Sequence, residues 1–150
     1  MIDFTGYSGI AKLDSQGRVP ILAPLCRILQ QSGNNTLFIR IDVFNDCLEL
    51  YSKDTWEAKQ AQYRKRLNES VKEEEDFYQS LVAAVDRVEM DSVGRIQFTK
   101  RAMRHANITT EALFIGSDDK IKIWNPERFK EIERKNRENF EENAKKFLQK

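Results

Sequence analysis

The sequence predicts a mainly β protein with peripheral helices, an α+β fold in which two copies of one short unit share a core. A ten-residue motif occurs twice, 77 residues apart, and this indicates an internal duplication. Segments after each copy alternate apolar and polar residues, as half-buried strands do, and strong helix-start signals follow them. Because a four-strand unit this short buries little surface alone, we expect the two copies to pair into one small β-barrel or sandwich.

The repeated motif reads apolar-Asp-Ser-x-Gly-Arg and is followed by a β-branched residue. The first copy lies at residues 12–21 and the second at residues 89–98, so that Asp14 corresponds to Asp91. Further matches follow in the same order: Arg27 with Arg104, Leu37–Ile39 with Leu113–Ile115, Leu48–Tyr51 with Ile121–Trp124, and the segment Ser52 to Trp56 with Asn125 to Phe129. This common order of features indicates that a unit of some 50 residues has been duplicated.

Each unit is expected to run strand, tight turn, strand, short helix, strand, strand. Asp can bond its own backbone and Gly tolerates positive φ, so we expect Asp14, Gly17, Asp91 and Gly94 to shape the two turns. The expected strands are 8–13, a strand from Arg18, 36–41 and 47–51, then 84–90, a strand from Arg95, 112–115 and 120–124; the expected short helices are 24–31 and 99–106.

A helix is expected to leave each unit. Ser52 is a good N-cap for a helix to about Leu67, a linker helix follows at about 69–81, and Asn125-Pro126 begins a C-terminal helix that extends to about Leu148. The predicted organisation is a first repeat (1–58), a helical linker (59–82), a second repeat (83–130) and a C-terminal helical extension (131–150).

The charge balance gives no sign of a polyanion partner by itself. The chain has 25 basic and 24 acidic residues, a net charge of +1. A nucleic-acid partner therefore requires positive charge gathered on one face or multiplied by oligomerisation. No apolar run is long enough to cross a bilayer and no secretory signal is visible at the start, so we expect a cytoplasmic protein without membrane contact.

The sequence contains no pattern that indicates a metal site or an enzyme active site. Cys26 and Cys47 lie 21 residues apart without a CxxC pair, and His105 is the only histidine, so no zinc-ligand spacing is present and we expect buried thiols, no metal and no cofactor. Nucleotide-binding, metalloprotease and serine-hydrolase motifs are absent from the sequence. We therefore expect no enzyme, and a turnover that depends on His105 would be needed to revive that hypothesis.

The repeated motif with its short helix resembles the signature of AbrB-like transcription factors. Two such units in one chain of this length resemble the MraZ family, regulators of the bacterial division and cell-wall gene cluster. Residues 88–96, 105–108, 121–124 and 47–51 together with Trp56 fall in the order and spacing of that family, and the resemblance covers roughly residues 4 to 132. The sequence departs from the family at Leu22 and Thr99, where a proline is usual, and at Cys26 and Met103, where an arginine is usual.

The resemblance implies two swapped-hairpin repeats that form one β-barrel, and a ring-shaped homo-oligomer. It also implies a nucleoid-associated repressor that binds repeated promoter sites in double-stranded DNA through Asp-x-x-x-Arg loops.

Five polar residues are the candidate DNA contacts. Arg18 and Arg95 each carry a planar fork of donors that suits a phosphate or the guanine edge. Gln16 is a candidate adenine reader, and Lys12 and Lys100 are candidate phosphate contacts. The alternative is that each arginine only pairs with the aspartate of its own turn, and that the glutamine and lysines are simply solvated.

Two further interpretations concern the whole chain. Tyr51, Trp56, Trp124 and Phe129 occupy repeat-equivalent positions, which favours core packing over a stacking platform for single-stranded bases. The near-neutral charge and the missing prolines leave open an oligomeric scaffold of the same fold without specific DNA binding. Two arginine loops on one basic face would favour DNA, and a neutral or acidic face would favour the scaffold.

Overall fold

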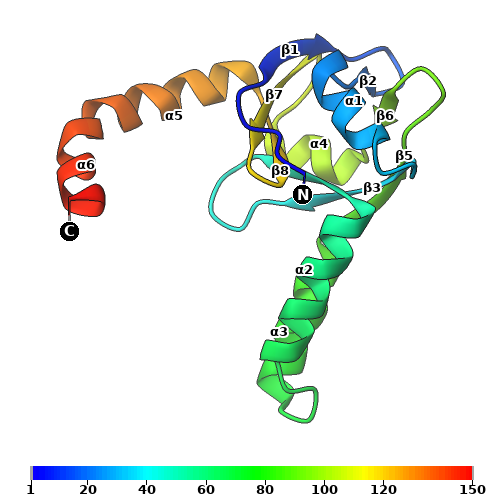
Figure 1. Ribbon diagram of the computed structural model, residues 1–150, viewed down its shortest axis with the longest axis vertical. Helices are drawn as coiled ribbons and strands as arrows, with labels where there is room; N and C mark the ends of the chain where they lie inside the picture. The colour runs from blue at the N-terminus through cyan, green and yellow to red at the C-terminus, as the bar shows by residue number, and fades with distance from the viewer. Residues whose placement is uncertain (1, 150) are drawn as a thin grey trace.

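The computed structural model describes residues 2–149 and shows a β core from which two helical arms extend (Figure 1). Six strands form one antiparallel sheet in the order β1-β7-β8-β4-β3-β5, and β2 pairs with β6 in a separate two-stranded ribbon. The strands are β1 (Ser8–Lys12), β2 (Arg18–Pro20), β3 (Thr36–Ile41), β4 (Leu48–Ser52), β5 (Val85–Glu89), β6 (Arg95–Gln97), β7 (Glu111–Ser117) and β8 (Lys120–Trp124). The α+β class is therefore confirmed.

Three of the helices in residues 2–149 begin directly after a side chain that caps them, as the sequence predicts. Ser52, Thr99 and Asn125 each accept a hydrogen bond from a backbone N–H in the first turn of the helix that follows, which confirms them as N-caps. The helices are α1 (Ala23–Gln30), α2 (Lys53–Arg66), α3 (Lys72–Ala83), α4 (Lys100–Ala106), α5 (Pro126–Glu138) and α6 (Phe140–Leu148). Within residues 2–149, none of them is long and apolar enough to span a membrane.

Strand pairing joins the two repeats to each other, so that neither repeat forms a separate sheet. β1 pairs with β7, β5 with β3, β2 with β6, and β4 with β8, and each of these pairs joins one repeat to the other. In the central pair Glu49 lies opposite Lys122, its repeat equivalent, and in the ribbon Val19 lies opposite Ile96. A pseudo-two-fold axis therefore passes through both pairs, and the two repeats share one core.

The strand register moves one of the sequence matches by one residue. Leu37 was matched with Leu113 by sequence, but Phe38 lies opposite Tyr51 and Leu113 lies opposite Trp124. Because Tyr51 and Trp124 are equivalent, Phe38 is the counterpart of Leu113. Successive side chains of a strand face opposite sides, so this shift is what places the buried positions of the two strands on the same face.

The expected single closed barrel is not found in residues 2–149. β1 and β5 are the two edges of the open six-stranded sheet, while β2 and β6 are only three residues long and pair with each other. The tight turn after β1 or β5 carries the chain away from the sheet edge into the ribbon. Val19 and Ile96 on the ribbon, together with Leu25 and Leu29 of α1, are buried in the same core as the sheet, so apolar side chains fill the space that strand closure would enclose.

An aromatic cluster anchors the base of the arm that α2 and α3 form. The Arg40 guanidinium lies 5.6 Å from the ring centroid of Tyr51 and 5.7 Å from those of Trp56 and Tyr63. It also forms an ion pair of 2.7 Å with Glu49. Trp56 is 2% exposed and Tyr51 is fully buried, which confirms core packing for these aromatic residues.

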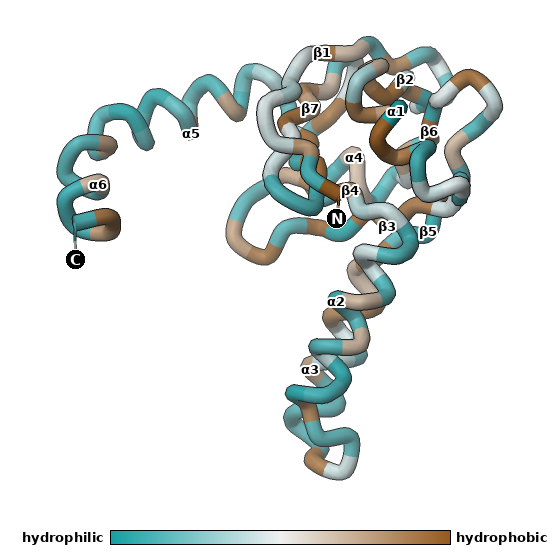
Figure 2. Tube along the Cα trace, in the orientation of Figure 1, coloured by the Kyte–Doolittle hydropathy of each residue, from teal (hydrophilic) through white to brown (hydrophobic). Residues whose placement is uncertain are grey.

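The expected single C-terminal helix is wrong, because it is interrupted at Asn139. There the backbone has φ −105° and ψ 7°, and the side-chain Nδ2 donates to the carbonyl of Lys135 at 3.3 Å. A side chain that bonds the local backbone competes with helix continuation. The arm of α5 and α6 leaves the core and is mostly hydrophilic, with apolar residues near its end (Figure 2).

The expected division of the chain stays a prediction. The boundaries after residues 58 and 130 fall inside α2 and α5. The outermost residues of the first and last expected segments, 1 and 150, lie outside the described residues.

Candidate nucleic-acid interface

Two loops with the same hydrogen bonds connect the sheet edges to the ribbon. In the first, Asp14 Oδ1 accepts the backbone N–H groups of Gln16 and Arg18. In the second, Asp91 Oδ1 accepts those at the equivalent positions, 93 and 95. The arginine Nε donates to the aspartate Oδ2 at 2.8 Å in both loops. The two loops are thus matched in structure as well as in sequence.

The glycine of each loop adopts a conformation that other residues avoid. Gly17 has φ +80° and Gly94 has φ +84°, in the left-handed region that glycine enters without a steric cost. The N–H of each glycine donates to the carbonyl of its loop aspartate at 3.1 Å. This turn brings the aspartate and the following arginine close enough to pair.

The ion pair of each loop leaves part of the arginine available. The backbone N–H of Arg18 lowers the pKa of the Asp14 carboxyl, and the N–H of Arg95 does the same for Asp91, so both carboxylates stay ionised at neutral pH. The arginine side chains are 37% and 36% exposed. Within residues 2–149, only Nε of either guanidinium is engaged in a hydrogen bond, so two Nη groups remain for a ligand.

The ribbon presents both arginines on one face. Arg18 lies opposite Gln97 and Arg95 lies opposite Pro20. Side chains alternate along a strand, and the intervening pair of Val19 and Ile96 is buried. Arg18, Arg95 and Gln97 therefore lie on the outward face.

Backbone hydrogen bonds tie each loop to the other repeat. The N–H of Ile21 donates to the carbonyl of Gly94 at 3.0 Å, and the N–H of Phe98 donates to the carbonyl of Gly17 at 3.2 Å. These two bonds are related by the pseudo-two-fold axis. The loops consequently form one unit and neither can move alone without breaking a bond to its partner.

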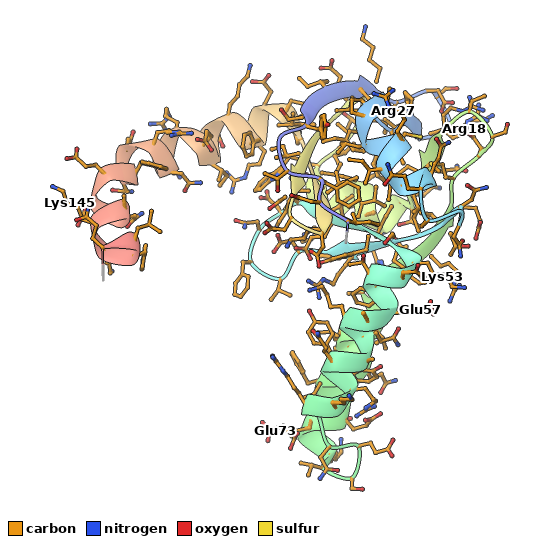
Figure 3. The ribbon with its side chains drawn as sticks, viewed as in Figure 1. Arg18, Arg27, Lys53, Glu57, Glu73 and Lys145 are labelled. Carbon is orange, nitrogen blue, oxygen red and sulfur yellow. The ribbon has the colours of Figure 1, made fainter. Side chains whose placement is uncertain are left out.

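Each short helix packs beneath the loop of the other repeat: α1 beneath the second loop and α4 beneath the first. A Cβ added at Gly94 would lie 2.9 Å from Sγ of Cys26 on α1, and one added at Gly17 would lie 3.5 Å from Sδ of Met103 on α4. The two positions where the resembling family has arginine therefore hold sulfur side chains that support the opposite loop. Arg27, next to Cys26, is exposed and lies at the same end of the molecule as Arg18 (Figure 3).

The remaining candidates are placed at different distances from the ribbon. Gln16 is exposed, and its carbonyl accepts a 2.8 Å hydrogen bond from Nε2 of Gln97. Lys100 is exposed at the start of α4 and lines a shallow hollow together with Gln97. Lys12 lies outside the ribbon, at the end of edge strand β1 opposite Glu111.

Gln97 was missed by the sequence reasoning. Its signal is its position two residues after Arg95, because residues two apart in a strand share a face. The counterpart of Gln97 in the first repeat is Pro20, so comparison of the two motifs alone did not mark it.

The described part of the chain contains neither a cluster of metal ligands nor an activated thiol nucleophile. Within residues 2–149 no three His, Cys, Asp or Glu side chains gather in a way that could hold a metal ion. Cys26 and Cys47 are free thiols, half-buried and buried respectively. Burial raises the pKa of both thiols, which keeps them protonated and weakly reactive.

The duplicated α+β core presents two arginine forks on one face of a ribbon, a chemistry that suits contacts to phosphates and guanine edges of nucleic acid. Comparison with known proteins identifies the family to which the sequence is similar. The sequence model of the family described as "MraZ protein, putative antitoxin-like" matches residues 81–150. This match covers less than half of the chain, and it is the relatives, 38% identical over most of its length, that show that the chain belongs to the MraZ family.

The relatives that carry the name "Transcriptional regulator MraZ" include two proteins of the genus Bacteroides. The protein of Bacteroides fragilis is 38% identical over 132 residues, which covers 88% of this chain and 83% of the relative. That of Bacteroides thetaiotaomicron is 38% identical over 128 residues, covering 85% and 81% respectively. The family is one of transcriptional regulators and not of enzymes, in agreement with the expectation from the sequence.

Proposed function

We propose that this chain is a sequence-specific DNA-binding transcriptional regulator, a repressor that binds repeated promoter sites of the division and cell-wall gene cluster through its Asp-x-x-x-Arg loops. The observation that carries the proposal is the pair of matched loops on one ribbon, with Arg18 and Arg95 on the same outward face. The name of the relatives supports it. Such a role places the protein in the cytoplasm, at the nucleoid.

The loop geometry supports DNA contact and turn-locking by the same arginines. Each aspartate holds the Nε edge of its arginine at 2.8 Å, which limits the rotamers that binding would otherwise have to restrict. The two Nη groups remain as a fork for a phosphate or for O6 and N7 of guanine. In this proposal Gln16 reads adenine, and Lys12 and Lys100 contact phosphates.

Oligomerisation supplies the contacts that one chain lacks. With a net charge of +1 and each loop arginine paired with an acid, one chain carries little excess positive charge. A homo-oligomeric ring would repeat the loops and bind promoter repeats by avidity. We assign this assembly to the arms, since Phe140, Phe147 and Leu148 are 55%, 56% and 80% exposed.

The strand pairing supports an AbrB-like swapped-hairpin interpretation of the core. The first strand of each repeat pairs with a strand of the other repeat, and the second strands of the two repeats pair with each other. In the proposed organisation, residues 1–58 and 83–130 act as one DNA-binding unit, whereas residues 59–82 and 131–150 extend from it.

A mobility-shift assay tests the proposal. The purified protein is titrated against the duplex upstream of its own gene and against a scrambled duplex, at two salt concentrations. We expect specific binding that weakens with salt and that falls about 5- to 150-fold in Arg18→Ala or Arg95→Ala, because a good bidentate contact contributes about 1–3 kcal/mol. Arg134→Ala is the matched control, because Arg134 is an exposed arginine on α5 that also pairs with an acid four residues away.

The proposal is overturned if both duplexes bind equally weakly at low salt, or if the Arg18→Ala, Arg95→Ala double variant binds as the control does. Thermal unfolding of each variant shows whether the fold is intact.

A second candidate function is an oligomeric scaffold of the same fold without specific DNA binding. The ion pairs that neutralise both loops and the exposed apolar residues of the arms favour it. It predicts an intact oligomer that does not distinguish the two duplexes.

A further inference from the structure

The two loops differ at one solvent-facing position. Their sequences are Asp-Ser-Gln-Gly-Arg and Asp-Ser-Val-Gly-Arg, with Gln16 in the first loop and Val93 in the second. Each of these residues donates its backbone N–H to the aspartate of its loop, so the two backbones make the same hydrogen bond. Only the side chains distinguish the two loop tips.

The side chain of Val93 has no structural task in the described chain. It is 69% exposed and lies outside both apolar clusters of the core. The turn itself needs only a backbone N–H at this position, as Gln16 shows in the other loop. An exposed valine thus stands beside an arginine on the proposed DNA-binding surface, where a polar residue would fold equally well.

The tips also differ in how they are held. Nε2 of Gln97 donates to the carbonyl of Gln16 at 2.8 Å. The equivalent of Gln97 in the first repeat is Pro20, which has no side-chain donor and therefore cannot hold the carbonyl of Val93 in the same way. One tip is polar and tethered, and the other is apolar and lacks that tether.

We infer that Val93 contacts the 5-methyl group of a thymine, so that the two loops read different bases. This inference rests on the proposed function and deepens it. The thymine methyl is the apolar group that base edges present in the major groove, whereas a glutamine amide matches the donor and acceptor of adenine. An exposed valine beside a guanidinium fork has the chemistry to select thymine next to a phosphate or guanine contact.

The difference between the two loop tips sets the direction in which the chain binds DNA. The pseudo-two-fold axis through Val19 and Ile96 relates the two loops, and two identical loops would bind a duplex equally well in either direction. The difference between Gln16 and Val93 breaks this equivalence. Each chain therefore binds its site in one direction.

Uracil substitution tests the inference directly, because deoxyuridine lacks only the methyl group. The upstream duplex is prepared with every thymine of the bound site, or none, replaced by deoxyuridine. Loss of one buried methyl corresponds to about a fourfold change in affinity. We expect the wild-type protein to bind the uracil duplex about fourfold more weakly per contacted methyl, and Val93→Ala to bind both duplexes with the same weakened affinity.

Two control variants complete the experiment. Val43→Ala makes the same change at a valine that is 71% exposed in the connection between β3 and β4, and it should keep the wild-type preference for thymine. Gln16→Ala should weaken binding to both duplexes and leave the thymine preference unchanged. Because uracil can also alter the duplex itself, the comparison of wild type with Val93→Ala on the same two duplexes isolates the valine contribution.

The outcomes separate this inference from the proposed function. Equal wild-type affinity for the two duplexes, or an unchanged thymine preference in Val93→Ala, overturns the role of Val93, while a loss of binding in Arg18→Ala would still support the DNA-binding loops. If the wild-type protein does not distinguish its upstream duplex from the scrambled one, the proposed function fails and the role of Val93 fails with it.

Discussion

Replacing Gly94 with alanine tests how tightly the second loop packs on α1. Gly94 has φ +84°, and an added Cβ would lie 2.9 Å from Sγ of Cys26. A left-handed conformation costs an L residue about 1–2 kcal/mol, and the close contact adds about 1 kcal/mol because the sulfur must move. We expect Gly94→Ala to lower the free energy of unfolding by about 2–3 kcal/mol.

Gly33 provides a matched control for the backbone contribution. It has φ +71° with nothing within 4 Å of an added Cβ, so Gly33→Ala should lose only about 1–2 kcal/mol. Gly17 is expected to behave like Gly33, because its added Cβ would meet Met103 at the ordinary contact distance of 3.5 Å.

Urea unfolding followed by the fluorescence of the two buried tryptophans measures these differences. A double-mutant cycle of Gly94→Ala with Cys26→Ala should recover about 1 kcal/mol, since the second change removes the sulfur. The packing argument is refuted if Gly94→Ala costs no more than Gly33→Ala, or if the two changes show no coupling.

Three further predictions concern binding, the core and pH. Lys100→Ala should weaken binding to specific and scrambled duplexes alike and reduce the slope of log affinity against log salt by about 0.9, as expected for one lost phosphate contact; an unchanged slope in mobility shifts would exclude that contact. Arg40→Met should lower the free energy of unfolding in urea by about 1.5–3 kcal/mol, because the Glu49 side chain, 6% exposed, loses its 2.7 Å ion pair with Arg40 and keeps only the 3.2 Å ion pair with Lys122; a loss below about 1 kcal/mol, typical of exposed pairs, would show that Glu49 does not depend on Arg40. The loop hydrogen bonds lower the pKa of Asp14 and Asp91 from an ordinary 3.8, so their contribution to stability is present above that pH and is lost as the pH falls through their folded-state pKa. Replacing both with asparagine should flatten this acid-side loss of stability, and identical acid-unfolding curves would contradict the assignment.

Much of the local structure was predictable because its causes lie within a few residues. The caps at Ser52, Thr99 and Asn125 depend on side chains that bond the next turn, and the Asp-Ser-x-Gly-Arg turn closes within five residues. The interruption at Asn139 has an equally local cause, but the apolar residues on both sides of it follow helical spacing and concealed it. Family resemblance predicted the regulator class, which the relatives confirm.

The candidate site was predictable in its residues but not in its arrangement. The motif marked Arg18 and Arg95 as equivalent, yet nothing in the sequence shows that they share one face of a two-stranded ribbon or that Gln97 lies opposite Arg18 and bonds the first loop. These relations depend on pairing between segments 77 residues apart, which is decided by the burial of Val19 and Ile96 in the common core.

By itself, the sequence determined the duplication, the strand and helix segments, and the chemistry of each loop, because hydrogen bonds between near neighbours and periodic apolar residues act locally. Only the tertiary structure decided that the repeats exchange strands, that the sheet stays open beside a ribbon, and that each short helix supports the opposite loop. These three features follow from the burial of the apolar faces of the two repeats against each other. The free energy of that burial depends on both repeats together, so it cannot be predicted from any single segment.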